Sequence, residues 1–259
     1  MSDSLNSLPP LFIENIRTQL GNEAESFLKT YNEPHTRGIR FRGINTPVPA
    51  QDLLGKIPYV PNAYYLSNES RVGTTILHDA GAFYIQEPSA MAAAAVLAPK
   101  PTDTVLDLCA APGGKSTQIA MSFHPALLVS NEPIPSRAQI LSSNIERMGI
   151  KNGIVTSAYP DQLRQKWPSF FDRILVDAPC SGEGMFRKDP QARLEWAESS
   201  PTHCAGRQAD ILDAAADMLK PGGTLVYSTC TFNILENDQT ISAFLSRHSD
   251  FSLVPFSLS

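Results

Sequence analysis

Val105-Leu-Asp-Leu-Cys-Ala-Ala-Pro-Gly-Gly-Lys-Ser116 is the stretch of sequence that decides the fold of this chain. It begins as an apolar run, breaks at Pro112-Gly-Gly114 and restarts at Lys115 with a helical pattern. This order predicts a strand, a tight turn and a helix. Two adjacent glycines leave the backbone N–H groups of the helix start open to a ligand. A turn that needs glycine only for packing is the simpler alternative.

Two nucleotide-binding motifs partly match this stretch. The Rossmann fingerprint requires Gly-x-Gly-x-x-Gly, and the chain offers only the adjacent pair Gly113-Gly114. The P-loop ends in Gly-Lys-Ser, as Gly114-Lys-Ser116 does, but it also requires a glycine where Cys109 stands. Neither motif is complete, so the stretch alone does not decide the ligand.

The composition describes a soluble globular protein. Its 259 residues, 42% of them hydrophobic and 18% charged, suffice for one large domain or two small ones. No apolar run is long enough to span a bilayer, and Met1-Ser-Asp-Ser4 lacks the features of a secretory signal, so we expect a cytoplasmic protein without a membrane partner. The sequence shows no self-associating stripe, and we expect a monomer.

The four cysteines and the net charge narrow the function further. The cysteines are far apart, with no Cys-x-x-Cys pair, so we expect neither a metal site nor a disulfide framework. The net charge of −5 argues against a protein that holds nucleic acid by bulk charge, although a local basic groove remains compatible with it.

The composition and patterning divide the chain into two predicted domains. Residues 1–76 form a small N-terminal α/β domain, with a helix over 9–20 and a strand over 37–42. Alternation along that strand puts Arg40 and Arg42 on one face, as a phosphate-contacting strip or as a solvated edge. This domain is therefore a candidate for RNA contact, and residues 77–259 form the catalytic domain.

Strands and helices alternate from residue 105 onward. Strands are predicted over 105–108, 126–130, 154–156, 173–177 and 224–227, with helices over 115–123, 135–148, 201–219 and 235–247. Such alternation predicts an α/β domain with a doubly wound, mostly parallel sheet. Ligands bind beyond the carboxyl ends of the strands in such sheets, so the residues after each strand become candidates for the site.

Three of these positions carry unusual residues. Glu132 follows the second strand at the spacing typical of an acid that accepts ribose hydroxyls, although an acid near a helix start is the common alternative. Cys180 and Cys230 follow the fourth and fifth strands. One buried cysteine would be structural, but two at the same edge of a sheet favour chemistry.

Thiols beside a nucleotide-like cofactor suit methylation of C5 of cytosine. That carbon is a poor nucleophile, and a thiolate that adds to C6 activates it toward an electrophilic methyl group. An acid near N3 assists by neutralising the charge that develops, and Asp177, at the end of the fourth strand, is the candidate.

Three motifs together resemble the S-adenosylmethionine-dependent RNA 5-methylcytosine methyltransferases of the NOL1/NOP2/Sun family. They are Leu106-Asp-Leu-Cys-Ala-Ala-Pro-Gly-Gly-Lys115, Asp177-Ala-Pro-Cys-Ser-Gly-Glu-Gly184 and Ser228-Thr-Cys-Thr231. Gly184-Met-Phe-Arg-Lys-Asp-Pro190 and the segment 78–91 look most like the bacterial RsmF-type branch, which acts on ribosomal RNA. The resemblance covers about residues 1–250 and implies a Rossmann-like methyltransferase fold.

The resemblance also implies roles for individual residues. Cys230 would be the nucleophile, Cys180 would assist release of the product, and Asp177 and Lys115 would contact the reacting base. S-adenosyl-L-methionine would be the cofactor and ribosomal RNA the partner. The residues implied in cofactor binding are Cys109, Ala110, Ala111, Pro112, Gly113, Gly114, Lys115, Glu132, Arg137 and Asp177. Phe186 and Arg187 are candidates to support an unstacked base.

The chain departs from the family pattern in two places. Relatives carry an adenine-binding aspartate directly after the third strand, whereas here Asp161 lies past Pro160, so adenine recognition has no assigned residue. RsmF-type proteins also continue into a C-terminal RNA-binding region. Either this sequence is the first part of a longer protein, or RNA docking falls to residues 1–76.

Two other functions remain open. A DNA cytosine methyltransferase would use Cys180 and leave Cys230 unexplained. A non-catalytic ribosome-assembly protein that keeps the methyltransferase fold is the other alternative, and retention of both thiols with Asp177 argues against it.

Overall fold

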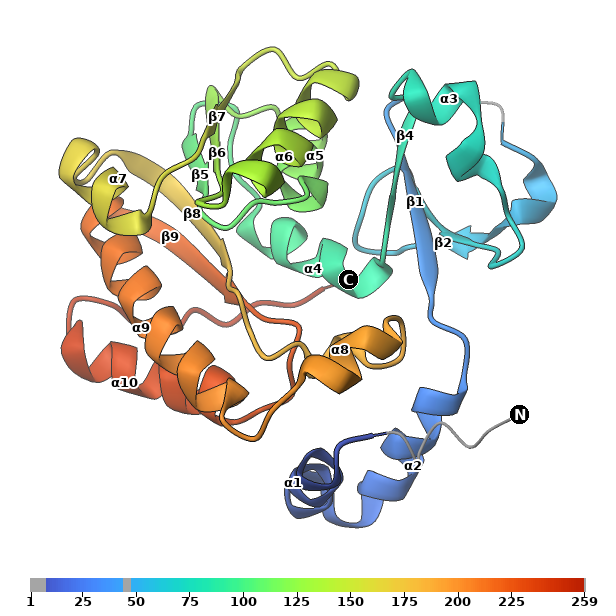
Figure 1. Cartoon of the computed structure of the whole chain (residues 1–259). Coiled ribbons are helices and arrows are strands. Elements are labelled where there is room, and N and C mark those ends of the chain that lie inside the picture. Colours follow the sequence, from blue (N-terminus) through green and yellow to red (C-terminus); the bar gives the residue numbers. More distant parts are fainter. Residues whose placement is uncertain (1–7, 44–47, 259) are drawn as a thin grey trace. The chain divides into compact units, whose positions relative to one another are not determined.

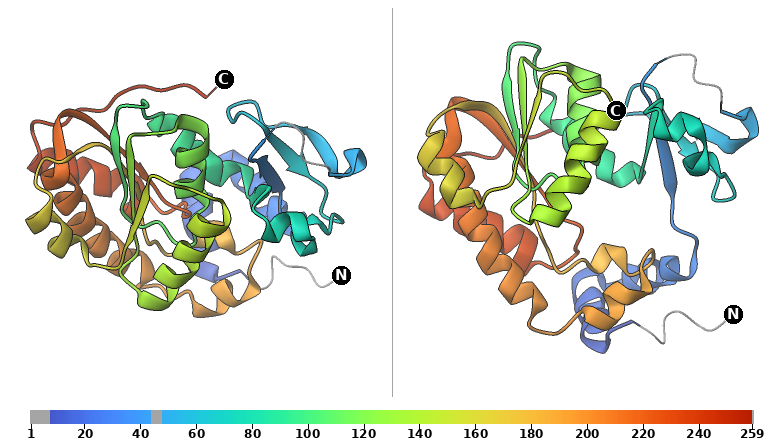
Figure 2. Two further views of the ribbon diagram at one scale, coloured as in Figure 1. Left: turned by 90° about the horizontal axis from the view of Figure 1, so that it is seen from above. Right: turned by 45° about the horizontal axis from the view of Figure 1, so that its top comes forward.

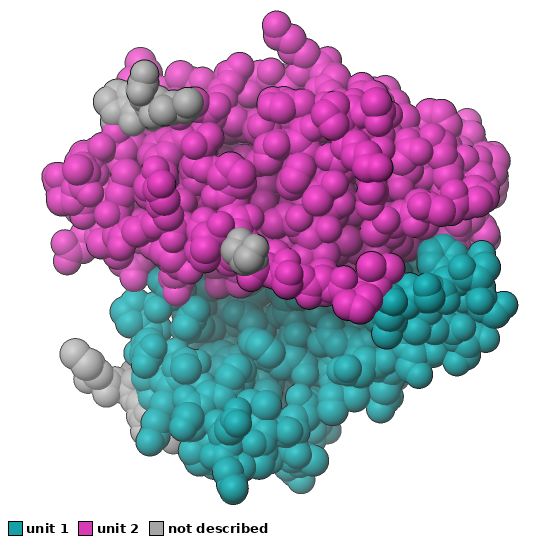
Figure 3. All heavy atoms as spheres, turned by 180° about the vertical axis from the view of Figure 1, so that it is seen from behind, with its two compact units in different colours: residues 1–35, 178–212, 228–253 teal, residues 36–177, 213–227, 254–259 magenta. Residues whose placement is uncertain are grey.

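The computed structural model describes residues 8–43 and 48–258 (Figure 1). The segment Met1–Ser4, from which we predict the absence of a secretory signal, lies outside the described residues. The chain divides into two compact units, coloured in Figure 3. Unit 1 comprises residues 1–35, 178–212 and 228–253, and unit 2 comprises residues 36–177, 213–227 and 254–259.

A five-stranded sheet forms the centre of unit 2. Its strands are β5 (Thr104–Asp107), β6 (Leu127–Asn131), β7 (Gly153–Thr156), β8 (Phe171–Asp177) and β9 (Leu219–Ser228), in the order β7-β6-β5-β8-β9. β5 pairs in parallel with β6 and β8, and β6 pairs in parallel with β7. This confirms the predicted α/β fold with a parallel sheet. The strand order reverses at β5, and such a reversal is where ligands bind in doubly wound sheets.

The helices of this part of the chain are α4 (Pro88–Leu97), which precedes β5, and α5 (Gly114–Phe123), α6 (Pro135–Arg147) and α7 (Pro160–Lys166), which lie between strands in the sequence. Figures 1 and 2 show α5 and α6 alongside β5 and β6. Leu97 of α4 and Ile119 of α5 pack with Val105, Leu128 and Leu175 of the strands in one apolar core. This core fixes the strand ends that carry the predicted site.

A second, antiparallel sheet precedes the parallel one in the sequence. It contains β1 (Arg37–Phe41), β2 (Leu53–Lys56), β3 (Ala63–Leu66) and β4 (Phe83–Gln86) in the order β2-β3-β1-β4, with the short helix α3 (Ile76–Asp79) before β4. The predicted α/β region ahead of the main sheet is thus present. The boundary at residue 76 stays a prediction.

Arg40 has a different environment from the one its alternation suggests. β1 pairs with both β3 and β4 and is therefore an interior strand, and its consecutive residues Gly38, Ile39 and Arg40 are all buried. Arg40 is 1% exposed, and its guanidinium donates hydrogen bonds to the Gly114 carbonyl at 3.0 Å and to Thr117 Oγ1 at 2.8 Å. The expected strip of two arginines is therefore wrong for Arg40, whereas Arg42 is exposed.

Unit 1 is built mostly from helices. They are α1 (Pro10–Leu20), α2 (Ala24–Lys29), α8 (Pro190–Glu195), the first part of α9 (Ser200–Met218), a π-helical turn (Leu235–Gln239) and α10 (Thr240–Arg247). Phe12, Ile16, Leu28, Tyr31 and Phe186 form its apolar core. The predicted helices over 9–20, 201–219 and 235–247 correspond to these elements within a few residues, whereas α7 and α8 were not anticipated.

Candidate active site

The loop between β5 and α5 is tied to its neighbours through the backbone. Leu108 N–H donates to the Leu175 carbonyl at 2.9 Å, and Ala110 N–H donates to the Asn131 carbonyl at 2.8 Å. Gly113 caps α5 with φ +110°, a backbone conformation that favours glycine. A Cβ atom at this position would lie 3.2 Å from Leu141 Cδ1. Both conformation and space therefore explain the glycine that the sequence places after the strand.

Asp107, at the end of β5, is fully buried beneath this loop. Ser116 Oγ donates to Asp107 Oδ2 at 2.6 Å, and Ser130 Oγ donates to Ser116 Oγ at 2.8 Å. Burial raises the pKa of Asp107 to about 7. In the described part of the chain, Asp107 Oδ1 has no hydrogen-bond partner. A buried acceptor without a donor suits an N–H group brought by a ligand.

Three of the predicted cofactor residues are joined at the end of β6. The Glu132 side chain is 2% exposed, and its Oε2 lies 3.2 Å from Arg137 Nη1. Arg137 Nη2 also donates to the Ala111 carbonyl at 3.3 Å. Arg137 thus links the acid after β6 to the loop after β5, and a carboxylate stands at the edge where a ribose diol would bind.

Lys115 and Asp177 form an ion pair across the same edge of the sheet. Lys115 Nζ lies 2.6 Å from Asp177 Oδ2, and both side chains are partly buried. Cys109 lies in the same region. Burial raises the pKa of its thiol, and the nearby carboxylates of Asp107, Glu132 and Asp177 add to the effect. A thiol that stays protonated at neutral pH is suited to lining a site rather than to nucleophilic attack.

The other two predicted thiols meet in unit 1. Cys180 Sγ and Cys230 Sγ are 3.1 Å apart without a disulfide bond, and Cys230 N–H donates to Cys180 Sγ at 3.2 Å. The hydrogen bond shared with the Cys230 thiol raises the pKa of Cys180, and burial raises it further. Two cysteines 50 residues apart in sequence therefore form one thiol pair, as two strand ends at one edge predict.

Two buried glutamates beside this pair were not predicted. Glu183 is 1% exposed and Glu236 is 0% exposed. Glu183, which is near Cys180 in the sequence, accepts a hydrogen bond from the segment of Cys230. Glu236, which is near Cys230, accepts one from the segment of Cys180. Glu183 lies between two glycines inside the quoted motif 177–184, and this position is a sequence signal that could have marked it as a site residue. Glu236 follows the third motif without any distinguishing pattern.

Two other sequence-based expectations meet a different environment. Phe186 is fully buried, with its ring centroid 5.2 Å from that of Phe12, so the prediction that it supports an unstacked base is wrong and core packing explains it. Asp161 lies in the first turn of α7 and pairs with Arg164 at 3.2 Å. Adenine recognition still has no assigned residue.

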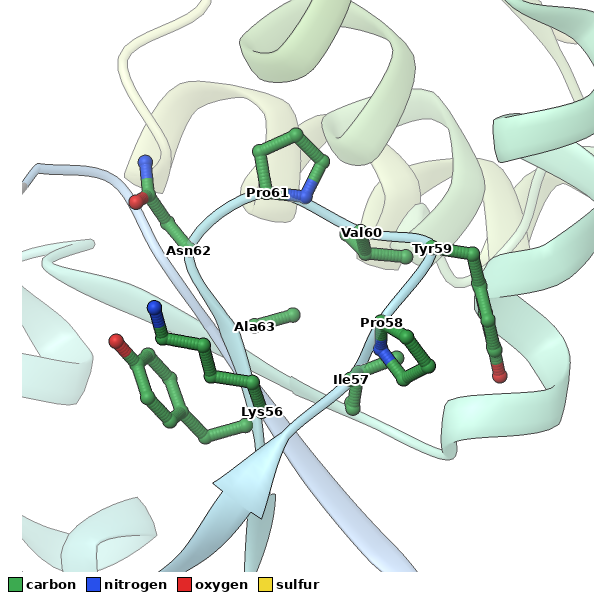
Figure 4. A pocket seen from close by; sticks show the side chains of 9 residues that line it. Lys56, Ile57, Pro58, Tyr59, Val60, Pro61, Asn62 and Ala63 are labelled. Carbon is green, nitrogen blue, oxygen red and sulfur yellow. The ribbon is translucent and has the colours of Figure 1, made fainter. Parts of the chain in front are cut away.

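Neither of two surface hollows contains a predicted site residue. One, of about 410 Å³, lies at the connection between β2 and β3, where Figure 4 shows the side chains from Lys56 to Ala63. The other, of about 510 Å³, lies between α1, α2 and Phe232. Within the described residues, no cluster of three or more His, Cys, Asp or Glu is arranged to hold a metal ion. None of the helices described has the length and apolar character that crossing a membrane requires.

Comparison with family models matches almost the whole chain. Residues 94–259 match the model described as 16S rRNA methyltransferase RsmB/F. Residues 8–88 match the model described as the N-terminal domain of 16S rRNA methyltransferase RsmF.

Individual proteins give a consistent result. The chain is 38% identical over 253 residues to ribosomal RNA small subunit methyltransferase F of Pectobacterium atrosepticum, covering 90% of this chain and 52% of that protein. It is 37% identical to the protein of the same name from Serratia proteamaculans, covering 94% and 54%. Among solved structures, PH0851 is 29% identical with a TM-score of 0.88, covering 96% of this chain and 59% of that one. The chain thus spans about half the length of the curated relatives it matches.

Proposed function

The chain belongs to the family of 16S rRNA methyltransferases RsmB/F, and on this premise we propose that it methylates C5 of a cytosine in 16S rRNA. The thiol pair carries the proposal. Among base methylations, attack on a ring carbon of a pyrimidine is the one that needs a thiol nucleophile, and two thiols stand 3.1 Å apart at the expected position in the sequence.

The residues around β5 and β6 fit S-adenosyl-L-methionine as the cofactor. Among the described residues none donates to Asp107 Oδ1, Gly113 keeps the turn clear of a side chain, and the Glu132 carboxylate stands at the next strand end. In this proposal the loop 109–115 holds the methionine part and Glu132 the ribose, with Arg137 orienting Glu132. When bound, the cofactor supplies an electrophilic methyl group on a sulfonium centre.

We assign the attack on the base to Cys230. Its thiolate forms a bond to C6, and the electrons of the C5–C6 double bond become available at C5 for the methyl group. The choice between the two sulfurs follows the resemblance, in which the thiol of the motif Ser228-Thr-Cys-Thr231 is the nucleophile.

Lys115 and Asp177 contact the cytosine ring in this proposal. The carboxylate of Asp177 accepts a hydrogen bond from the exocyclic amine, and the ammonium of Lys115 stabilises the negative charge that develops at N3 and O2. Their 2.6 Å ion pair fixes both groups relative to each other before the base arrives.

We assign the release of the methylated base to Cys180. In this step the C5 proton passes to the Cys180 thiolate, its bonding electrons re-form the C5–C6 double bond, and Cys230 leaves as a thiolate. Because Cys180 Sγ contacts Cys230 Sγ, it lies next to the carbon bound to Cys230 and to the proton on its neighbour.

RNA contact by the antiparallel sheet remains part of the proposal. Arg42, Lys56 and Arg71 are exposed on the segments of this sheet, and they replace Arg40 as candidates for phosphate contact. Local basic groups of this kind suit a chain whose net charge is −5.

The test is a denaturing gel after incubation with the cofactor and unmodified 16S rRNA, either as a transcript or in small ribosomal subunits. Wild type, Cys180→Ala and Cys230→Ala are compared. We expect Cys180→Ala to accumulate a covalent protein–RNA adduct, whereas Cys230→Ala forms none. An adduct in Cys230→Ala alone would reverse the two roles. Absence of methyl transfer and of adduct with every RNA form would contradict the proposed reaction.

A further inference from the structure

We propose that Glu183 and Glu236 are positioning residues that clamp the two cysteine loops together and hold their sulfurs in contact. The Cys180 loop is defined here as residues 178–184 and the Cys230 loop as residues 228–233. All of these residues belong to unit 1. The catalytic meaning of the clamp rests on the proposed function, but the geometric claim does not.

Glu183 reaches from the Cys180 loop to the Cys230 loop. Its Oε2 accepts the Phe232 N–H at 3.1 Å, and its Oε1 accepts Asn233 Nδ2 at 3.3 Å. Its own carbonyl accepts a hydrogen bond from the Tyr31 hydroxyl at 3.3 Å, which ties this position to the helical core. Glu183 therefore fixes the chain directly after Cys230.

Glu236 makes the opposite connection. Its Oε2 accepts the Ser181 N–H at 2.9 Å and Gln208 Nε2 at 3.0 Å, and its Oε1 accepts the Ser181 hydroxyl. Gln208 also donates to the Pro179 carbonyl at 3.0 Å. Glu236 therefore holds Ser181 directly and Pro179 through Gln208, from a position six residues beyond Cys230.

The two connections place the loops in register. Gly184 N–H donates to the Cys230 carbonyl at 2.8 Å, and a Cβ atom at Gly184 would lie 2.8 Å from that oxygen, which excludes a side chain. Burying two carboxylates near each other costs free energy, and burial with repulsion from Glu236 raises the pKa of Glu183. Apolar side chains would pack the loops at lower cost, so the hydrogen bonds themselves are what these glutamates contribute.

The contact between the sulfurs can be measured without RNA or cofactor. Diamide oxidises two neighbouring thiols to a disulfide, and its N=N bond takes up the two protons and two electrons that they lose. The rate at which the Cys180–Cys230 disulfide forms therefore reports how often the sulfurs meet. It is followed by quenching with maleimide and by mass spectrometry of the linked peptides.

We expect Glu183→Gln and Glu236→Gln to lower the rate of disulfide formation by about 10-fold or more. A carboxylate accepts hydrogen bonds at both oxygens, whereas an amide turns its NH2 group toward one of the donors and loses that hydrogen bond. Glu198→Gln is the matched control, since Glu198 is an exposed glutamate of the same unit, and it should react at the wild-type rate. Folded variants that form the disulfide at the wild-type rate would overturn the proposal, as would equal slowing in Glu198→Gln.

Milder variants keep the test decisive if the glutamine variants do not fold. Ser181→Ala removes one donor to Glu236, and Asn233→Ala removes one donor to Glu183, while the backbone donors stay in place. Each should slow the disulfide by about 2-fold to 5-fold. Wild-type rates in both folded variants would contradict the clamp.

Steady-state kinetics then connects the clamp with the reaction. Loss of positioning lowers kcat and leaves the KM for RNA within about 2-fold, whereas general loss of structure changes both. Slower disulfide formation in the glutamine variants, together with a wild type that methylates no RNA, would leave the clamp standing and reject the proposed function.

Discussion

The loop after β5 and the pair of cysteine loops hold their side chains by different means. The first is one continuous strand, turn and helix, and its residues are fixed by backbone hydrogen bonds, a glycine with positive φ and a short serine network. The second joins residues 50 apart through the carboxylates of two buried glutamates. A local site depends on the conformation of its own backbone, whereas a distant pair depends on side chains that link its two loops.

The largest expected effect is a loss of stability in unit 1 that leaves the cofactor affinity of the loop after β5 unchanged. Phe186→Ala should lower the free energy of unfolding by about 3–5 kcal/mol, because it empties the fully buried centre of the unit 1 core. Urea unfolding measures the change. Phe232→Ala is the matched control, 41% exposed, with an expected loss of about 1 kcal/mol. Cofactor affinity in folded Phe186→Ala should stay at the wild-type level, and a parallel loss would show that the two regions are not independent.

Arg40→Ala tests the connection between the antiparallel sheet and α5. Losing the charged donors to the Gly114 carbonyl and Thr117 should cost about 2–3 kcal/mol and weaken cofactor binding. Arg42→Ala, at an exposed position, should change stability by less than about 0.5 kcal/mol. Thermal unfolding and RNA binding at several salt concentrations distinguish them. RNA binding that depends less on salt in Arg42→Ala than in Arg40→Ala supports phosphate contact by Arg42 and a structural role for Arg40. The opposite result would support phosphate contact by Arg40.

Gly113→Ala tests how far the first region depends on its backbone. The left-handed conformation and the 3.2 Å approach to Leu141 should cost about 1–2 kcal/mol and reduce cofactor affinity about 10-fold. Gly206→Ala, in the interior of α9 with open space around it, should instead stabilise the protein by up to about 1 kcal/mol. Calorimetric titration with S-adenosyl-L-methionine and thermal unfolding give both quantities. Unchanged affinity in Gly113→Ala would mean that the turn does not shape the ligand site.

The last prediction concerns the titration of Asp107, whose effect is spread over several pH units. Its folded-state pKa of about 7 lies above the ordinary value of 3.8, so its contribution to stability is fully present below pH 4 and is lost as pH rises toward 7. The slope from this group is at most about 1.4 kcal/mol per pH unit. Asp107→Asn removes it, so the difference in urea midpoint between wild type and variant should change between pH 5 and 7 and level off above. A constant difference would contradict the raised pKa.

The first region could be predicted because its information is local. The order of apolar run, glycine pair and helix from Val105 to Ser116 predicts β5, the turn and α5, and the alternation that follows predicts the parallel sheet. Parallel strands end at one edge, so the placement of Lys115 with Asp177, of Glu132 with the β5 loop and of Cys180 with Cys230 follows from topology. The chemical roles of these residues remain proposals.

Other features depend on tertiary contacts that no short stretch of sequence encodes. Arg40 alternates like a residue on a solvated strand face, but its side chain is buried and donates hydrogen bonds to Gly114 and Thr117 of α5. Phe186 stands in a loop motif, and only the packing of α1 against that motif shows it to be a core residue. Glu183 stands inside a quoted motif and Glu236 outside any motif, but the hydrogen-bond partners of both lie about 50 residues away.

The crossed anchoring of the cysteine loops has a consequence for exchange of segments between homologues. The segment 178–184 carries Glu183, which accepts a hydrogen bond from the Cys230 loop, and the segment 228–236 carries Glu236, which accepts one from the Cys180 loop. A chimaera that receives only one of the segments 178–184 and 228–236 from a distant relative loses hydrogen-bond partners in both. The two segments therefore have to be exchanged together, because a tolerated change in one segment requires a matching change in the other.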